Sequence, residues 1–96
     1  MQNQLLKPEE LEMLMKTFPK WEHHDKCLKR IFEFKDFKEA FDFMIRVAEI
    51  AETLDHHPDW SNSWNEVSIQ ISTHSANGLT HLDHRFVEEV ESVIEG

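Results

Sequence analysis

Hydrophobic side chains recur every three or four residues in three separate stretches, which is the period of an amphipathic α-helix. The first begins at Pro8 and ends at Pro19, since proline suits the first turn of a helix but not its interior. The second follows Asp36, a helix-capping residue, and runs to Leu54. The third starts at Thr80. The predicted stripes are Leu11, Leu14, Met15 and Phe18, then Phe37, Ala40, Phe41, Met44, Val47, Ala48, Ala51 and Leu54, then Leu82, Phe86, Val90, Val93 and Ile94.

Between these stretches the apolar and polar residues alternate, which is typical of strands with one buried face. Residues 67–71 alternate most clearly, and residues 28–34 do so with Arg30 as an interruption. A short strand at 21–24, joined to 28–34 by a turn, predicts a hairpin, and residues 59–64 predict a bend with a short strand. The order α-β-β-α-β-β-α indicates one α+β domain over residues 1–96, with a four-stranded antiparallel sheet and three helices packed on one face.

Two apolar features lie outside this predicted core. Phe43, Ile45 and Ile50 fall off the stripe of the second helix, which is therefore apolar over more than one face. Trp64 falls on the side of the last strand that faces away from the core. Because large apolar side chains are seldom left in water, we expect a partner subunit or a pocket to cover them.

Composition narrows the possible partners. The formal net charge of −9 disfavours nucleic acid and anionic membranes, which such a surface would repel. Cys27 is the only cysteine, so neither a disulfide framework nor a thiolate metal cluster is expected. No apolar run approaches the ~20 residues of a membrane span, and no signal-peptide core is visible. We therefore expect a cytoplasmic protein without membrane contact.

Candidate chemistry is concentrated where the second helix ends. His56 and His57 precede Pro58, and the residue before a proline is pushed out of the helical region. The two imidazoles should therefore lie at a rigid corner and point in different directions. Imidazole, with an ordinary pKa of about 6.5, suits proton transfer near neutral pH. The alternative is a polar corner that contains two histidines by chance.

A third histidine, His74, follows the last strand in a hydroxyl-rich loop. In an α+β domain this loop and the corner can meet, with Trp60 or Trp64 able to stack on a flat ligand. The expected pocket is ringed by three imidazoles and two carboxylates: His56, His57, His74, Glu52 and Asp83. Asp83 has an alternative role, because its spacing from Thr80 is that of a capping box.

Metal sites explain these histidines less well. A zinc site of three histidines is one possibility, but adjacent histidines seldom both bind one ion. His81 and His84 are three residues apart on a helix without a third ligand implied by spacing, and the His23-His24 pair is expected to be solvated. Metal-free acid–base chemistry fits better.

The spacing of these residues carries a resemblance to a known family. In order, the chain has Glu52, three residues, His56-His57-Pro58, five residues, Trp64, nine residues, His74, eight residues and Asp83. This arrangement resembles the signature of the pterin-4a-carbinolamine dehydratases. The segments Phe34-Lys35-Asp36-Phe37 and Arg46-Val47-Ala48 are also similar, and the similarity runs from about Leu28 to the C-terminus.

The resemblance implies dehydration of 4a-hydroxytetrahydrobiopterin to quinonoid dihydropterin and water, in tetrahydrobiopterin recycling for aromatic amino-acid hydroxylases. It implies no metal and no organic cofactor. A homodimer or homotetramer would explain the second apolar face of the helix at 36–54 and the outward Trp64. Some members of the family also act as dimerisation partners of transcription regulators, which is the alternative function. The implied acid–base residues are His56, His57 and His74. The implied substrate-binding residues are Glu52, Asp55, His56, His57, Trp60, Ser72, Thr73, His74, Ser75 and Asp83.

Overall fold

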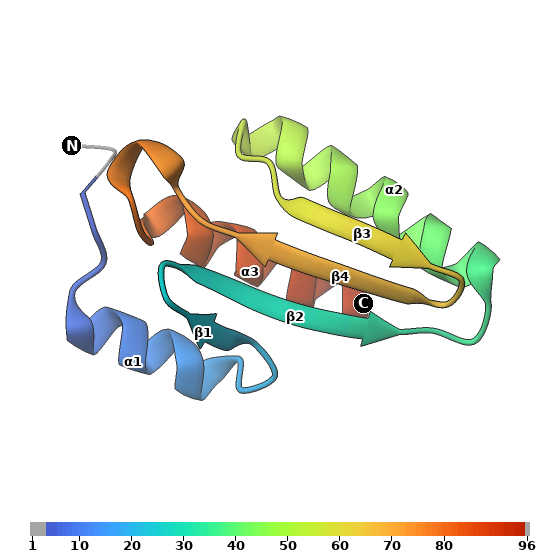
Figure 1. Cartoon of the computed structure of the whole chain (residues 1–96), viewed down its shortest axis with the longest axis horizontal. Coiled ribbons are helices and arrows are strands. Elements are labelled where there is room, and N and C mark those ends of the chain that lie inside the picture. The colour runs from blue at the N-terminus through green and yellow to red at the C-terminus, as the bar shows by residue number, and fades with distance from the viewer. Residues whose placement is uncertain (1–3, 96) are drawn as a thin grey trace.

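The chain folds as the predicted succession of helices and strands. The computed structural model describes residues 4–95. In order, the elements are α1 (Pro8–Thr17), β1 (Glu22–His24), β2 (Cys27–Glu33), α2 (Phe37–Leu54), β3 (Asp59–Ser63), β4 (Glu66–Ile71), the short 3₁₀ helix η1 (His74–Ala76) and α3 (His81–Glu95). The predicted order α-β-β-α-β-β-α is confirmed (Figure 1).

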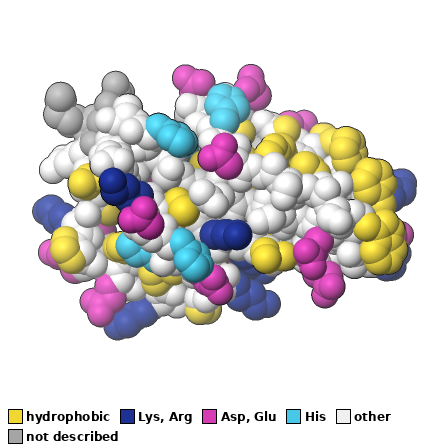
Figure 2. Space-filling view, viewed as in Figure 1, with side chains coloured by type: hydrophobic (Ala, Val, Ile, Leu, Met, Phe, Trp, Pro, Cys, Tyr) yellow, Lys and Arg dark blue, Asp and Glu magenta, His cyan; other side chains and the backbone are white. Residues whose placement is uncertain are grey.

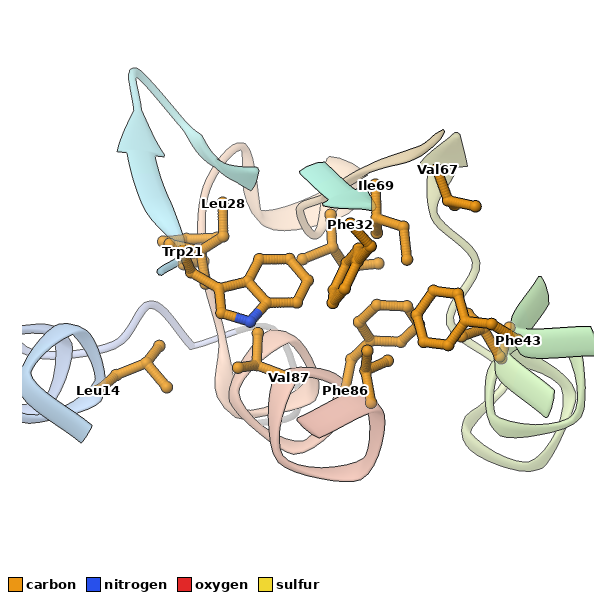
Figure 3. Packing of buried hydrophobic residues seen from close by; sticks show 14 of the residues in the cluster. Leu14, Trp21, Leu28, Phe32, Phe43, Val67, Ile69, Phe86 and Val87 are labelled. Carbon is orange, nitrogen blue, oxygen red and sulfur yellow. The ribbon is translucent and has the colours of Figure 1, made fainter. Parts of the chain in front are cut away.

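The four strands form one antiparallel sheet in the order β1-β2-β4-β3. β4 lies inside the sheet, and its alternation of buried Val67, Ile69 and Ile71 with polar residues confirms the pattern read from the sequence. The helices cover the face that carries these apolar residues (Figures 1 and 3). The opposite face stays open and is largely polar.

Each helix contributes to one hydrophobic core beneath the sheet. Leu14 of α1, Phe43 of α2 and Phe86 of α3 are all buried in the same cluster (Figure 3). Phe32 of β2 contacts Phe43, with ring centroids 4.8 Å apart. α1 is thus held to the domain chiefly through a few apolar side chains, of which Leu14 is the fully buried one.

The contribution of α1 to the core can be measured. Leu14→Ala should lower the free energy of unfolding by about 2–5 kcal/mol, because it leaves a cavity in a packed core. The neighbouring Met13, which is 62% exposed, provides the control, and Met13→Ala should change stability by less than ~0.5 kcal/mol. Urea denaturation followed by circular dichroism would test both. Equal stability of the two variants would show that α1 is not packed on the core.

α2 carries a second apolar face, as expected, but the assignment of three phenylalanines to its faces was wrong. Phe43, expected off the stripe, is buried, whereas Phe37 and Phe41, expected on it, are 48% and 47% exposed. The core-facing line is Ala40, Phe43, Val47 and Ala51. Apolar residues at both 41 and 43 fit helical spacing, so the period alone could not choose between them. The exposed line consists of Phe37, Phe41 and Ile45.

Two further expectations need correction. Trp64 does not lie in a strand but in the β3–β4 turn, with a positive φ of 48° and 65% of its surface exposed. On α3, Val87 is fully buried although the predicted stripe omitted it, while Ile94 is exposed. The stripe of α3 is therefore rotated slightly from the predicted one.

The interruption of β2 by Arg30 has a structural reason. Arg30 forms an ion pair with Glu91 of α3 and lies over the ring of Phe32, with its guanidinium carbon 4.3 Å from the ring centroid. The indole nitrogen of Trp21 donates to the same Glu91 carboxylate at 2.8 Å. A charge near the core is tolerated here because it is paired and hydrogen-bonded. Within residues 4–95, none of the helices has the length and apolarity to cross a membrane.

Candidate active site

The corner after α2 is built by a left-handed cap. Asp55 has φ 51° and ψ 47°, and its N–H donates to carbonyls of the last helical turn. The N–H of His56 also turns back, to the carbonyl of Ala51 at 3.0 Å. The chain then passes through Pro58 into β3. This geometry separates the two imidazoles as predicted: His56 is 8% exposed, whereas His57 is exposed to solvent.

His56 is held by a fully buried carboxylate. Its Nε2 lies 2.7 Å from Oδ1 of Asp83, which has 0% exposure. The other oxygen, Oδ2, accepts a hydrogen bond from the Thr73 hydroxyl at 2.7 Å and one from the Thr80 N–H at 2.8 Å. The carboxylate is thus surrounded by three hydrogen-bonding groups at the N-terminus of α3.

Asp83 therefore forms two kinds of contact. It closes the first turn of α3 through the Thr80 N–H, and it also holds His56. Thr80 extends the network, since its hydroxyl lies 2.8 Å from the Thr73 hydroxyl and accepts from the Leu82 N–H at 3.2 Å. The sequence predicted Thr80 only as the start of a helix. Its hydrogen bond with the Thr73 hydroxyl was not predicted, because no pattern in the sequence indicates it.

The other two histidines form exposed pairs. His57 Nε2 lies 2.6 Å from Oε2 of Glu52, another residue of the predicted site. His74 Nε2 lies 4.0 Å from Oδ2 of Asp59, a partner that the sequence analysis did not consider. Because Asp59 is the first residue of β3, this contact brings the loop after β4 beside the corner. The loop and the corner therefore lie beside each other at this contact.

A pocket of about 250 Å³ opens beside His74. It is lined by Ser72, Thr73 and His74, which were predicted to bind substrate, and by the β1–β2 turn, including His24 and Cys27. This differs from the expected pocket: of the five residues expected to ring it, only His74 lines this one, and His56, His57, Glu52 and Asp83 do not. Figure 2 looks onto the open face of the sheet, where histidine side chains gather toward the end that carries the β1–β2 turn and apolar side chains toward the other.

The remaining predicted residues are distributed around these contacts. Asp55 is exposed at the corner and Ser75 is exposed in η1. Trp60 pairs with Ile69 and packs against the core on the helix-covered face, and Trp64 lies in the turn at the far end of β3. Neither indole is placed as the sequence analysis expected for stacking on a ligand beside His74.

Potential metal ligands are dispersed over the part of the chain that the structure describes. Within residues 4–95, no three side chains of His, Cys, Asp or Glu are grouped so that they could hold a metal ion. His84 pairs with Glu88 at 3.5 Å along α3.

The pKa of the Cys27 thiol is raised above its ordinary value. Partial burial is the larger cause, and the nearby carboxylate of Asp25 is the second.

Comparison with known proteins decides the family. The family model described as pterin 4 alpha carbinolamine dehydratase matches residues 4–93. The chain belongs to the pterin-4a-carbinolamine dehydratase family. The resemblance inferred from the histidine spacing is thereby confirmed, and the match also includes residues before Leu28, where the similarity noted in the sequence began.

Relatives within this dehydratase family cover nearly the whole chain. Two relatives are provisionally named pterin-4-alpha-carbinolamine dehydratase. The one from a strain of Prochlorococcus marinus is 41% identical over 97% of this chain and 97% of its own length. The one from a strain of Synechococcus is 46% identical over 93% of this chain and 96% of its own length. A crystal structure titled transcriptional coactivator/pterin dehydratase, from Brucella melitensis, superposes with a TM-score of 0.88 at 37% identity. It covers 94% of this chain and 98% of its own.

Proposed function

We propose that this protein dehydrates a 4a-hydroxytetrahydropterin, specifically 4a-hydroxytetrahydrobiopterin, to the quinonoid dihydropterin, using His56, His57 and His74 as the acid–base set. The observation that carries the proposal is the buried His56–Asp83 pair, joined through Thr73 to the segment that carries His74. Membership in a dehydratase family gives the reaction class.

The reaction requires two proton transfers. An acid donates a proton to the oxygen on C4a as the C4a–O bond breaks, so that water leaves. A base takes the proton from N5, and the electrons of the N–H bond form the C4a=N5 double bond. Imidazoles can perform either transfer near neutral pH, and each positioned acid or base contributes about 10²–10⁴-fold.

The carboxylates act through the histidines. Asp83 fixes the ring of His56 through Nε2, which leaves Nδ1 as the nitrogen available for proton transfer. Glu52 does the same for His57 in a solvent-exposed setting. Backbone groups of residues 55–57 and 72–75 hold the pterin ring through amide-like hydrogen bonds, and no metal or organic cofactor takes part.

The test is a direct assay of the purified protein. Quinonoid dihydropterin formation from freshly generated carbinolamine should be accelerated well above the spontaneous rate, and the acceleration should be unchanged after dialysis against EDTA. Elemental analysis of the same sample provides the control for residual metal. A rate equal to the spontaneous one would reject the proposal, and a rate abolished by EDTA and restored by zinc would reject the metal-free mechanism.

A protein-interaction role is the second candidate. The exposed apolar line of α2, formed by Phe37, Phe41 and Ile45, is a surface that a protein partner would cover, and the Brucella structure is titled as a transcriptional coactivator as well as a dehydratase. The simpler occupant of this line is another copy of the chain, in a homodimer or homotetramer. We also propose that the protein acts in the same pathway as an aromatic amino-acid hydroxylase and that it is cytoplasmic.

A further inference from the structure

We propose that the pocket between the β1–β2 turn and the loop after β4 binds the polar substituent at C6 of the reduced pterin, a short chain bearing hydroxyl groups. This inference rests on the proposed function, because it takes the pterin ring to lie against His74. It assigns a role to the β1–β2 turn, whose histidine pair the sequence analysis treated as solvated.

The position of the pocket supports this assignment. Ser72, Thr73 and His74 line it on one side, and they belong to the segment proposed to hold the ring. His24 and Cys27 line it on the other side. A ligand whose ring contacts the His74 segment therefore has open space of about 250 Å³ directly beside it, and a substituent on the ring can enter that space.

The chemistry of the walls suits an uncharged chain with hydroxyl groups. The amide of Gln70, the hydroxyl of Ser72 and the imidazole of His24 each both donate and accept hydrogen bonds. The charged residues of the turn, Asp25 and Lys26, are of opposite sign. A phosphate group binds best where several cationic side chains converge, and an aliphatic chain binds best between predominantly apolar walls. A polyhydroxylated chain therefore matches this pocket best.

Hydrogen bonds within each wall order the pocket, more firmly on the loop, where Thr73 is buried, than on the turn, where His24 and Glu22 are exposed. On the turn, the His24 ring pairs with Glu22 at 2.7 Å, and the Cys27 thiol donates to the His24 carbonyl at 3.2 Å. On the loop, Thr73 and Gly78 form an antiparallel bridge, with the Thr73 N–H donating to the Gly78 carbonyl at 2.8 Å. A preformed site loses little conformational freedom on binding, which favours affinity and selectivity.

Cys27 offers a direct reporter, because it is the only cysteine in the chain and it lines this pocket. Cys27 would be alkylated with iodoacetamide at mildly alkaline pH, where the thiol with its raised pKa reacts measurably. Mass spectrometry would measure the rate of alkylation. Two ligands would be compared: a dihydropterin with a dihydroxypropyl chain at C6, and the same ring without a chain. At about ten times its Kd the first should slow alkylation roughly tenfold, and the second by less than about twofold.

Two neighbouring histidines give matched variants. His24 lines the pocket, whereas His23 pairs with Leu28 and lies on the other face of β1. His24→Ala should raise the Kd for the chain-bearing ligand about threefold to tenfold, as expected for one lost hydrogen bond, and leave that for the bare ring unchanged. His23→Ala should change neither value. Calorimetric titration measures both.

The outcomes separate this inference from the dehydratase proposal. If the enzyme turns over carbinolamine but both ligands protect Cys27 equally, or His24→Ala binds as His23→Ala does, the C6 subsite is refuted and the activity stands. If no turnover is found but the chain-bearing ligand alone protects Cys27, the subsite stands and the activity is refuted. Absence of protection by the chain-bearing ligand at saturation also overturns the subsite.

Discussion

Replacing His74 by alanine should lower kcat for carbinolamine dehydration by about 10²–10⁴-fold, the contribution of one positioned acid or base. The free energy of unfolding should change by less than ~0.5 kcal/mol. The reason for this contrast is exposure: the His74 side chain is 82% exposed and its contact with Asp59 is a long 4.0 Å, so it adds little to the fold. Stopped-flow measurement of dihydropterin formation, together with urea denaturation, would measure both effects.

The control for His74 is another exposed histidine at the start of a helical segment. His81, the first residue of α3, is exposed and lies outside the contacts described for the site. His81→Ala should retain kcat within about twofold, in contrast to the loss that removal of a positioned acid or base produces. Full activity of His74→Ala would remove His74 from the acid–base set.

Asp83→Asn should damage both stability and catalysis. The asparagine amide would face one of the three donors that now surround the carboxylate, leaving a buried polar group unsatisfied at a cost of about 1–3 kcal/mol. The imidazole of His56 would lose the negative partner that orients it, and kcat should fall by about 10²–10⁴-fold, the range for a general acid or base deprived of its function. Activity would be measured at a temperature where the variant is fully folded.

Glu52→Gln is the matched control for this substitution. Glu52 also pairs with a histidine, but its side chain is 79% exposed, and exposed ion pairs contribute only about 0–1 kcal/mol to stability. The glutamine variant should therefore unfold at nearly the same urea concentration as the parent. If Asp83→Asn were as stable as Glu52→Gln, the hydrogen-bond network assigned to the buried carboxylate would be wrong.

Much of the fold could be predicted because its periodic signals are strong. The alternation at Val67, Ile69 and Ile71 marked the inner strand, and Pro8, Pro19 and Asp36 marked helix boundaries that the structure reproduces closely. The orientation of individual side chains was harder to predict from the sequence. Phe41 and Phe43 both fit a helical stripe, so only the packing of Phe43 against Phe32 could decide between them.

The site was predictable in composition but not in arrangement. The spacing of His56, His74 and Asp83 led to the prediction that they act together, and the structure shows a hydrogen bond from the Thr73 hydroxyl, beside His74, to Asp83. The pairing of His74 with Asp59 depends on the antiparallel register of β3 and β4, which adjacency in sequence does not reveal. For the same reason, the approach of the β1–β2 turn to the His74 loop had no signal in the sequence.

The two contacts of Asp83 couple the docking of α3 to the orientation of His56. One carboxylate both starts α3 and grips His56, so a molecule whose last helix has not docked cannot have an oriented imidazole. Under the proposed function, incompletely folded or C-terminally truncated copies are therefore expected to be inactive. Dehydratase activity would then measure the number of fully folded molecules.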